Sequence, residues 1–152
     1  MAMLTMQRVF DAPPVKVFEF LTQSENLLNW WGPEGTVIRD HNLDFSKVGP
    51  WFAVMVGPEG GSAKVGGQVL EVTAPHAVEL TLSFEMEDGR GPESTIRFEV
   101  SARDTGGSHL TLTQTGLDPA HIEDMMNKGW NAALLRLENL VTKTNKGSTN
   151  NG

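Results

Sequence analysis

The sequence contains no cysteine and few basic residues, and each shortage excludes a class of protein. Without cysteine, the chain has no disulfide framework, no thiolate nucleophile and no thiolate metal ligand. Twelve Lys and Arg residues against 19 Asp and Glu residues give a formal net charge of -7. This charge repels phosphate backbones, so we expect no nucleic-acid partner.

Long apolar runs are also missing. No segment approaches the roughly 20 apolar residues that cross a bilayer, and the N-terminal "MAMLTMQRVF" lacks the basic and apolar parts of a signal peptide. We therefore expect a cytoplasmic protein with no membrane partner. A length of 152 residues suits a single domain, which we place at residues 1–144. The polar, Gly-containing end over residues 145–152 predicts a disordered tail.

Most of the chain alternates apolar and polar residues with a period of two, which is typical of strands. The clearest run is "AVELTLSFEME", followed by "STIRFEVSA" and "HLTLTQT". Gly-rich loops join these runs, so we expect three sequential antiparallel neighbours. Four further strands are expected near residues 3–10, 36–44, 51–57 and 63–73. In the last, Gly66-Gly67 predicts a bulge or bend.

Three segments have helical spacing instead. Two short helices are expected after the first strand, one with Asp11 as a capping residue and Pro14 in its first turn, the other beginning near Ser24. A long amphipathic helix is expected from Asp118, with Pro119 at its first position. Its apolar arc contains Ile122, Met126, Gly129, Trp130, Ala133, Leu134, Leu137, Leu140 and Val141.

A sheet with one apolar face needs a covering layer, and among the expected elements only the long helix can cross it. The fold class is therefore α+β: a curved antiparallel sheet of about seven strands around a long C-terminal helix, with two short helices after the first strand.

Several motifs in this order resemble the family named after the activator of the Hsp90 ATPase. They are "FDAPPVKVFEFLT", "WWGPEG", "GPEG", "GQVLEVTAP", "LTLTQTGL" and "GWNAALLRL". The family is part of the helix-grip, or START-like and Bet v 1-like, superfamily. The resemblance implies a deep apolar cavity between the sheet and the long helix. It does not imply a reaction, because this fold carries many functions.

The residues expected to line that cavity come from the short helices, the sheet and the long helix. They are Trp30, Trp31, Phe84, Phe98, Leu112, Gln114, Met126, Gly129 and Trp130. Adjacent helical residues diverge by about 100°, so we expect only one indole of the Trp30-Trp31 pair to anchor the core and the other to form a wall or lid. Gln114 continues an inward-facing strand pattern, so its amide needs a partner from protein, water or ligand. Gly129 leaves space for either a close-packed strand or a ligand.

Candidate catalytic groups do not converge. The four histidines are isolated in the sequence, and no pair has zinc-ligand spacing, so we expect no metal and no cofactor. Glu71 follows the Gly pair, which leaves its facing open between the rim and the cavity. No nucleophile motif is present, and we expect no catalytic residue.

Three functions are left open at this point. The leading interpretation is a non-enzymatic domain that binds a hydrophobic small molecule or regulates another protein. The second is an interaction module that stimulates an Hsp90-type chaperone, which the resemblance implies. The third is a cyclase or hydrolase that uses Glu71, Gln114 or a histidine. The ligand and the oligomeric state, monomer or homodimer, are not encoded in any motif.

Overall fold

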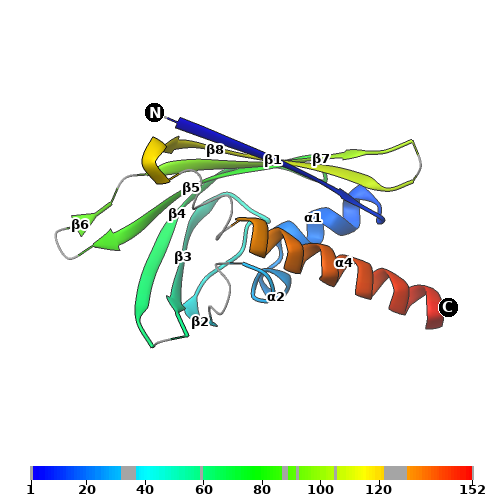
Figure 1. The fold of residues 1–152 in the computed structure, drawn as a ribbon, viewed down its shortest axis with the longest axis horizontal. Coiled ribbons are helices and arrows are strands. Elements are labelled where there is room, and N and C mark those ends of the chain that lie inside the picture. The colour runs from blue at the N-terminus through cyan, green and yellow to red at the C-terminus, as the bar shows by residue number, and fades with distance from the viewer. Residues whose placement is uncertain are drawn as a thin grey trace.

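The structure is a computed structural model, and it describes residues 2–31, 37–58, 60–86, 89–91, 93–104, 106–121 and 130–151. Its strands and helices follow the predicted order (Figure 1). The strands are β1 (Ala2–Phe10), β2 (Val37–His41), β3 (Gly49–Val56), β4 (Ser62–Thr73), β5 (Ala77–Met86), β6 (Gly89–Arg90), β7 (Ser94–Ala102) and β8 (Ser108–Leu117). The helices are α1 (Pro14–Thr22), α2 (Ser24–Leu27), the 3-10 helix η1 (Pro119–His121) and α4 (Asn131–Asn151).

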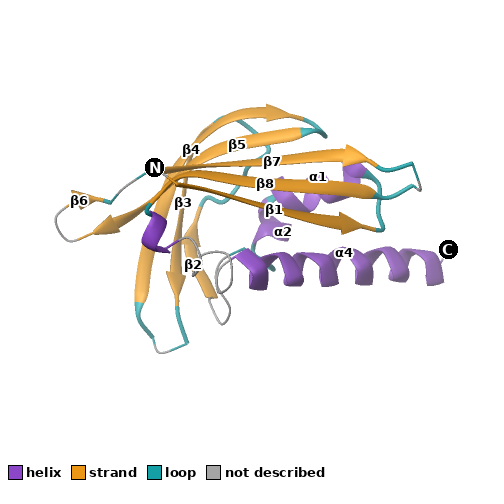
Figure 2. Cartoon of the chain, turned by 45° about the horizontal axis from the view of Figure 1, so that its top comes forward, coloured by secondary structure: helices purple, strands orange, loops and turns teal. Residues whose placement is uncertain are grey.

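The sheet is antiparallel and curved, with the strand order β1-β8-β7-β5-β4-β3-β2. β5, β7 and β8 are sequential neighbours, as their Gly-rich connections predict. The short β6 pairs only with the end of β5. β1 pairs with β8, so the first and last strands lie side by side. The sheet arches over α4, α1 and α2 (Figures 1 and 2).

Proline chemistry sets the start of α1. The N-cap residue is Pro13, and Pro14 occupies the first turn, where its missing N–H leaves no bond unmade. The predicted cap at Asp11 is wrong, because the helix begins three residues later and its N-cap makes no side-chain hydrogen bond. α2 is a single turn that begins at the predicted Ser24.

The helix α4 lays its apolar arc on the concave face of the sheet. The described members of the arc that are buried are Trp130, Ala133, Leu134, Leu137 and Val141. Asp118 accepts a hydrogen bond from the Ala120 N–H at the start of the 3-10 helix η1, 2.9 Å away. The described part of the long helix begins at Asn131, so its predicted start at Asp118 and Pro119 stays a prediction. None of the described helices is long and apolar enough to cross a membrane.

One arginine joins the edge strand β1 to α4. The Arg8 guanidinium donates to Asn131 Oδ1 at 2.6 Å and lies 3.3 Å from Glu138 Oε1. The link therefore holds the first three turns of the helix against the sheet edge. The backbone of α4 is helical through Asn151, which includes most of residues 145–152. The division into a domain at 1–144 and a tail stays a prediction.

No register shift falls at Gly66-Gly67, where the sequence predicts a bulge or bend, but both glycines have a packing role. A Cβ on Gly66 would lie 2.6 Å from the Trp51 carbonyl oxygen, and one on Gly67 would lie 2.1 Å from the Thr81 carbonyl oxygen. The neighbouring strands therefore approach β4 too closely for a side chain at either position. The register shift itself falls later, between Val69 and Glu71.

The Trp51 indole depends on this close approach. It faces Gly67 across β3 and β4, and its N–H donates to the Thr81 carbonyl of β5 at 3.0 Å. The backbone N–H of Gln68 bonds to the Thr81 hydroxyl instead, at 2.9 Å. One side chain from β3 thus reaches across β4 to β5, and it does so over a residue without a side chain.

We predict that Gly67→Ala lowers the free energy of unfolding by about 1–3 kcal/mol, because the added methyl overlaps the Thr81 carbonyl. Urea unfolding measures this change. Gly61→Ala is the matched control, since its Cβ would meet no atom within 4 Å, and it should change stability by less than about 0.5 kcal/mol. Equal stability of the two variants would contradict the packing account.

Candidate functional site

All four tryptophans of the chain gather in one aromatic cluster between the sheet and α4. We use the name aromatic cluster for Trp30, Trp31, Phe45, Trp51, Phe98 and Trp130. Its members come from the turn after α2, the β2–β3 connection, β3, β7 and the residue before α4. The cluster therefore joins segments that are far apart in the sequence.

Trp31 is the hub of the aromatic cluster. Its ring centroid lies 5.8 Å from Trp30, 5.3 Å from Phe45, 5.9 Å from Trp51 and 5.7 Å from Trp130. Each pair meets edge to face, with interplanar angles from 74° to 88°. This geometry places the positive ring edge against the negative ring face, which is the favoured arrangement for aromatic pairs.

Phe98 closes a ring of contacts on the sheet side. Its centroid lies 6.3 Å from Trp30 and 6.0 Å from Trp130. Because Trp30 and Trp130 also both touch Trp31, these four side chains form a closed cycle.

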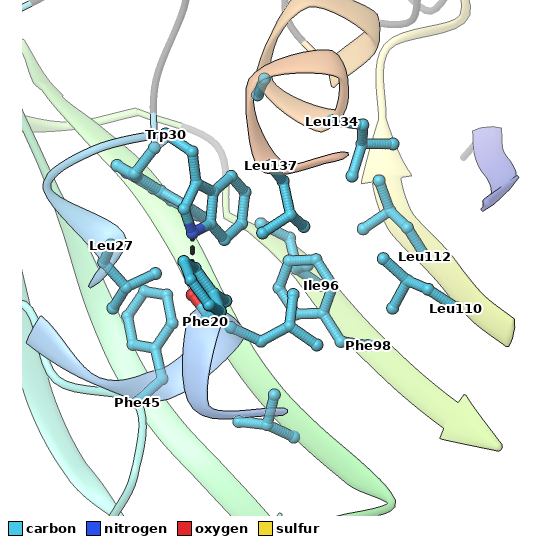
Figure 3. Close-up of a cluster of buried hydrophobic side chains, with 14 of the residues drawn as sticks. Phe20, Leu27, Trp30, Phe45, Ile96, Phe98, Leu110, Leu112, Leu134 and Leu137 are labelled. Atoms are coloured by element: carbon cyan, nitrogen blue, oxygen red, sulfur yellow. Dashed lines mark hydrogen bonds between the residues drawn. The ribbon is translucent and has the colours of Figure 1, made fainter. Parts of the chain in front are cut away.

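Both indoles of the Trp30-Trp31 pair are buried in the same cluster, at 1% and 5% exposure, so the expectation that only one of them anchors the core is wrong. That the other forms a cavity wall stays a prediction. α2 ends at Leu27, so neither residue follows helical spacing. The N–H groups of both residues bond to the Leu27 carbonyl in tight turns, and the rule of 100° per residue does not apply there. The Trp30 indole N–H donates to the Phe20 carbonyl at 2.8 Å (Figure 3).

Gln114 is fully buried on the concave face, as its strand pattern predicts. Its Oε1 accepts from the Trp130 indole N–H at 2.7 Å, and its Nε2 donates to Ser94 Oγ at 2.8 Å. Ser94 in turn donates to the Leu82 carbonyl at 3.4 Å. An indole only donates, so this direction of the Gln114 amide is the one that its neighbour requires.

These three hydrogen bonds form a relay that links the start of α4 to β8, β7 and β5. The amide has both kinds of partner within the protein, which is the satisfaction that a buried polar group needs. Only the second N–H and the second oxygen lone pair of the Gln114 amide are left to form a hydrogen bond with a ligand. A ligand role for Gln114 stays a prediction.

Leu112 and Phe98 lie where the sequence places them, on the concave face and fully buried. Figure 3 shows Leu134 and Leu137 of α4 pointing toward Leu112 and Ile96 of the sheet. Met126 and Gly129 lie outside the described residues, so their expected roles stay predictions.

Phe84, which is predicted to line the cavity, is 40% exposed, and its ligand role stays a prediction. Alternation correctly assigns it to the concave side, opposite the buried Val65 of β4. However, among the described residues β5 pairs with β7 only as far as Leu82, so Phe84 lies beyond the part of β5 that borders β7. The period of two fixes the face of a side chain and not its depth.

Glu71 points away from the aromatic cluster, on the convex face. Arg97 Nη1 lies 3.2 Å from Glu71 Oε1 and 3.4 Å from Glu79 Oε1, and its Nε lies 3.4 Å from Glu99 Oε2. Partial burial disfavours the guanidinium charge, but the hydrogen bonds to Glu71 and Glu99 outweigh it and raise the pKa of Arg97. Glu71 is therefore held in a surface ion-pair network, away from the concave face.

The histidines do not form a site in the described part of the chain. His41 Nδ1 accepts from the Leu43 N–H, His109 bonds Gln7, and His76 is exposed. Among the described residues, no group of three His, Asp or Glu side chains could hold a metal ion. The side chain of His121 is not described.

Sequence reasoning missed three members of this site: Phe45, Trp51 and Ser94. Phe45 lies in a connection without periodicity, and Ser94 begins a strand where a serine signals only a loop end. Trp51 had a usable signal, since it alternates with the buried Ala53. Its long-range bond to Thr81, however, has no local signature.

The fold and the aromatic cluster together define a helix-grip domain. The chain belongs to the family described as Activator of Hsp90 ATPase homolog 1-like protein, whose family model matches residues 11–142. It is similar to the crystal structure of the AHSA1 protein from Silicibacter pomeroyi, with 35% identity and a TM-score of 0.86 over 94% of this chain and 99% of that one.

Two further solved structures share the architecture. A protein from Nitrosomonas europaea has 26% identity and a TM-score of 0.76, over 95% of this chain and 96% of that one. A protein from Chromobacterium violaceum has 22% identity and a TM-score of 0.80, over 93% and 98%, and shows the fold alone. No functionally curated protein matches the sequence.

We predict that Gln114→Leu lowers the free energy of unfolding by about 1–3 kcal/mol, because the Trp130 N–H loses its acceptor and the Ser94 hydroxyl loses the donor that bonds to it. Gln7→Leu removes the amide of an exposed glutamine on β1 and should change stability by less than about 0.5 kcal/mol. Chemical denaturation of both variants measures the difference. If the variant at Gln114 were as stable as the one at Gln7, the relay would have no structural value.

Proposed function

We propose that this protein is a non-enzymatic binding domain for an uncharged aromatic or otherwise apolar small molecule, held between the sheet and α4. The observation that carries the proposal is the aromatic cluster with Trp31 at its hub. Trp31 and Trp130 are 5% and 7% exposed, whereas Trp30, Phe45 and Phe98 are at 1% or below. The Trp31–Trp130 edge is therefore the side of the cluster that is nearest to solvent.

The hydrogen-bonding groups of the cluster favour a ligand with one acceptor. Three indole N–H groups donate to protein oxygens, those of Phe20, Thr81 and Gln114. For the Trp31 indole N–H, no acceptor occurs among the described residues. A planar ligand at this edge could meet aromatic faces and accept one hydrogen bond, which is the usual composition of a small-molecule site.

The described core also favours a neutral ligand. The buried polar residues on both sides of the sheet, taken over the described chain, are Thr22, Thr81, Ser83, Ser94, Ser108 and Gln114, and none of these carries a charge. A carboxylate or ammonium group placed there would be desolvated without a counter-ion, at a cost of several kcal/mol. We therefore favour neutral aromatic compounds over fatty acids.

The two alternatives have weaker support. A cyclase or hydrolase needs convergent acid and base groups, and Glu71, one of its three candidates, is on the convex face, in ion pairs with Arg97. Stimulation of an Hsp90-type chaperone is suggested by the description of the family. That reading predicts faster ATP hydrolysis by such a chaperone when this protein is added, and a chaperone ATPase assay tests it separately.

We predict that the neutral dye N-phenyl-1-naphthylamine binds the folded protein and quenches its tryptophan fluorescence, because all four indoles lie in one cluster. Trp31→Phe should weaken this binding about tenfold, since it removes the free N–H and part of the contact surface. A fluorescence titration measures the affinity, and a neutral aromatic competitor should displace the dye.

Trp51→Phe is the matched control for this titration. The Trp51 indole contacts Trp31 from the β3 side, and its N–H donates to the Thr81 carbonyl. It therefore offers the dye no hydrogen bond, and the variant should bind the dye within about twofold of the parent. Absence of dye binding by the folded parent protein would contradict the proposal. So would equal weakening by both substitutions. If the dye binds as predicted, native mass spectrometry of protein purified from its own host would identify the natural ligand that it retains.

A further inference from the structure

The convex face of the sheet has a pocket whose lining includes one member of the aromatic cluster, Trp51. The inference drawn from this pocket is independent of the proposed function. The pocket has a volume of about 210 Å³ and is formed by β3, β4 and β5. The wall residues on which the inference rests are Phe52, Lys64, Gly66, Gln68, Ser83 and Glu85. They alternate with buried residues such as Val65 and Val69, so their side chains point away from the core.

The pocket exists because Gly66 has no side chain and lies at the centre of a cross-strand row of three residues. Gly66 lies between Phe52 on β3 and Ser83 on β5, and it is paired directly with both. A Cβ at Gly66 would lie 2.6 Å from the Trp51 carbonyl oxygen. The backbone geometry therefore keeps this position without a side chain, and the floor of the pocket stays open.

A buried hydroxyl lies beside that floor. Ser83 is 2% exposed, and its Oγ has no hydrogen-bond partner among the described residues. A buried hydroxyl without a partner is unfavourable by about 1–3 kcal/mol. It can both donate and accept, so a ligand in the pocket that offers either kind of group would satisfy it.

Two opposite charges form the rim. Lys64 Nζ lies 3.7 Å from Glu85 Oε1 and 5.1 Å from the centroid of the Phe52 ring. The side chains of Lys64 and Glu85 are 45% and 58% exposed, so this ion pair is weak and exchanges partners at little cost. The rim can therefore receive one negative and one positive group at the same time.

These features select the charge of the ligand. Glu85 and the formal net charge of -7 disfavour a simple anion such as phosphate, and Lys64 disfavours a simple cation. A molecule with both charges on neighbouring atoms would replace one exposed ion pair by two charge-assisted hydrogen bonds. The small floor over Gly66 and Ser83 admits only a short, polar side chain.

We propose that this pocket binds a small polar α-amino acid as its zwitterion. The ligand carboxylate pairs with Lys64, its ammonium pairs with Glu85, and its short polar side chain bonds the Ser83 hydroxyl. The site lies on the opposite face of the sheet from the aromatic cluster, so both sites can be occupied together.

The test is a titration of the isotope-labelled protein with L-serine, followed by backbone amide chemical shifts. We expect shifts at Gly66, Ser83 and their neighbours in β3, β4 and β5. Ser83→Ala and Lys64→Gln should each weaken serine binding about five- to tenfold, as expected for one lost hydrogen bond or charge contact. Ser101→Ala, an exposed serine elsewhere on the convex face, should leave the affinity unchanged.

Acetate and methylammonium each carry one of the two charges of serine, and both should bind at least about tenfold more weakly. The spectra also report whether each variant is folded, and Ser83→Ala removes only a hydroxyl that has no partner in the described part of the chain. The proposal is overturned if serine shifts no resonance around Gly66, if both variants bind serine as tightly as the parent, or if acetate alone binds as tightly as serine.

Discussion

The contacts of Trp31 are the interaction on which the rest of the structure depends. This one indole touches the turn after α2, the β2–β3 connection, β3 and the residue that precedes α4. Edge-to-face aromatic pairs contribute about 0.5–1.5 kcal/mol each beyond the burial of their surface. Several such pairs are a large fraction of the 5–15 kcal/mol that typically separates folded from unfolded domains. The hub therefore decides whether the helices and the sheet form one cooperative unit.

The curvature of the sheet and the hub support each other. Trp51 reaches Trp31 only because its indole lies over Gly67, and the same indole replaces a missing ladder bond by donating to Thr81. Gly66, the preceding residue, allows the close approach of β3 on the other side. The same pair of glycines thus lies opposite Trp51 on the concave face and at the floor of the Ser83 pocket on the convex face. One local constraint, two adjacent glycines, shapes both sides of the sheet.

The fold could be predicted from the sequence because its signals are local. Alternation in "AVELTLSFEME" and the arc from Trp130 to Val141 each describe one element, and Gly-rich loops order the three central strands. The site could be predicted only in part. Gln114 and Leu112 follow strand parity, but Trp31 lies beyond the end of α2, where no periodicity applies. Phe84 has the right parity at the wrong depth, and the bond from Trp51 to Thr81 joins strands that only the folded sheet brings together.

Hydrogen exchange of the indole N–H protons tests the central claim most directly. If the aromatic cluster is one cooperative unit, the bonded indole protons of Trp30, Trp51 and Trp130 should exchange only through the same opening, with free energies close to that of global unfolding. The measurement follows three resolved indole resonances of the isotope-labelled protein over time in deuterated buffer. Exchange of the Trp130 proton at a much lower free energy than those of Trp30 and Trp51 would contradict the account, because α4 would then open independently of the sheet.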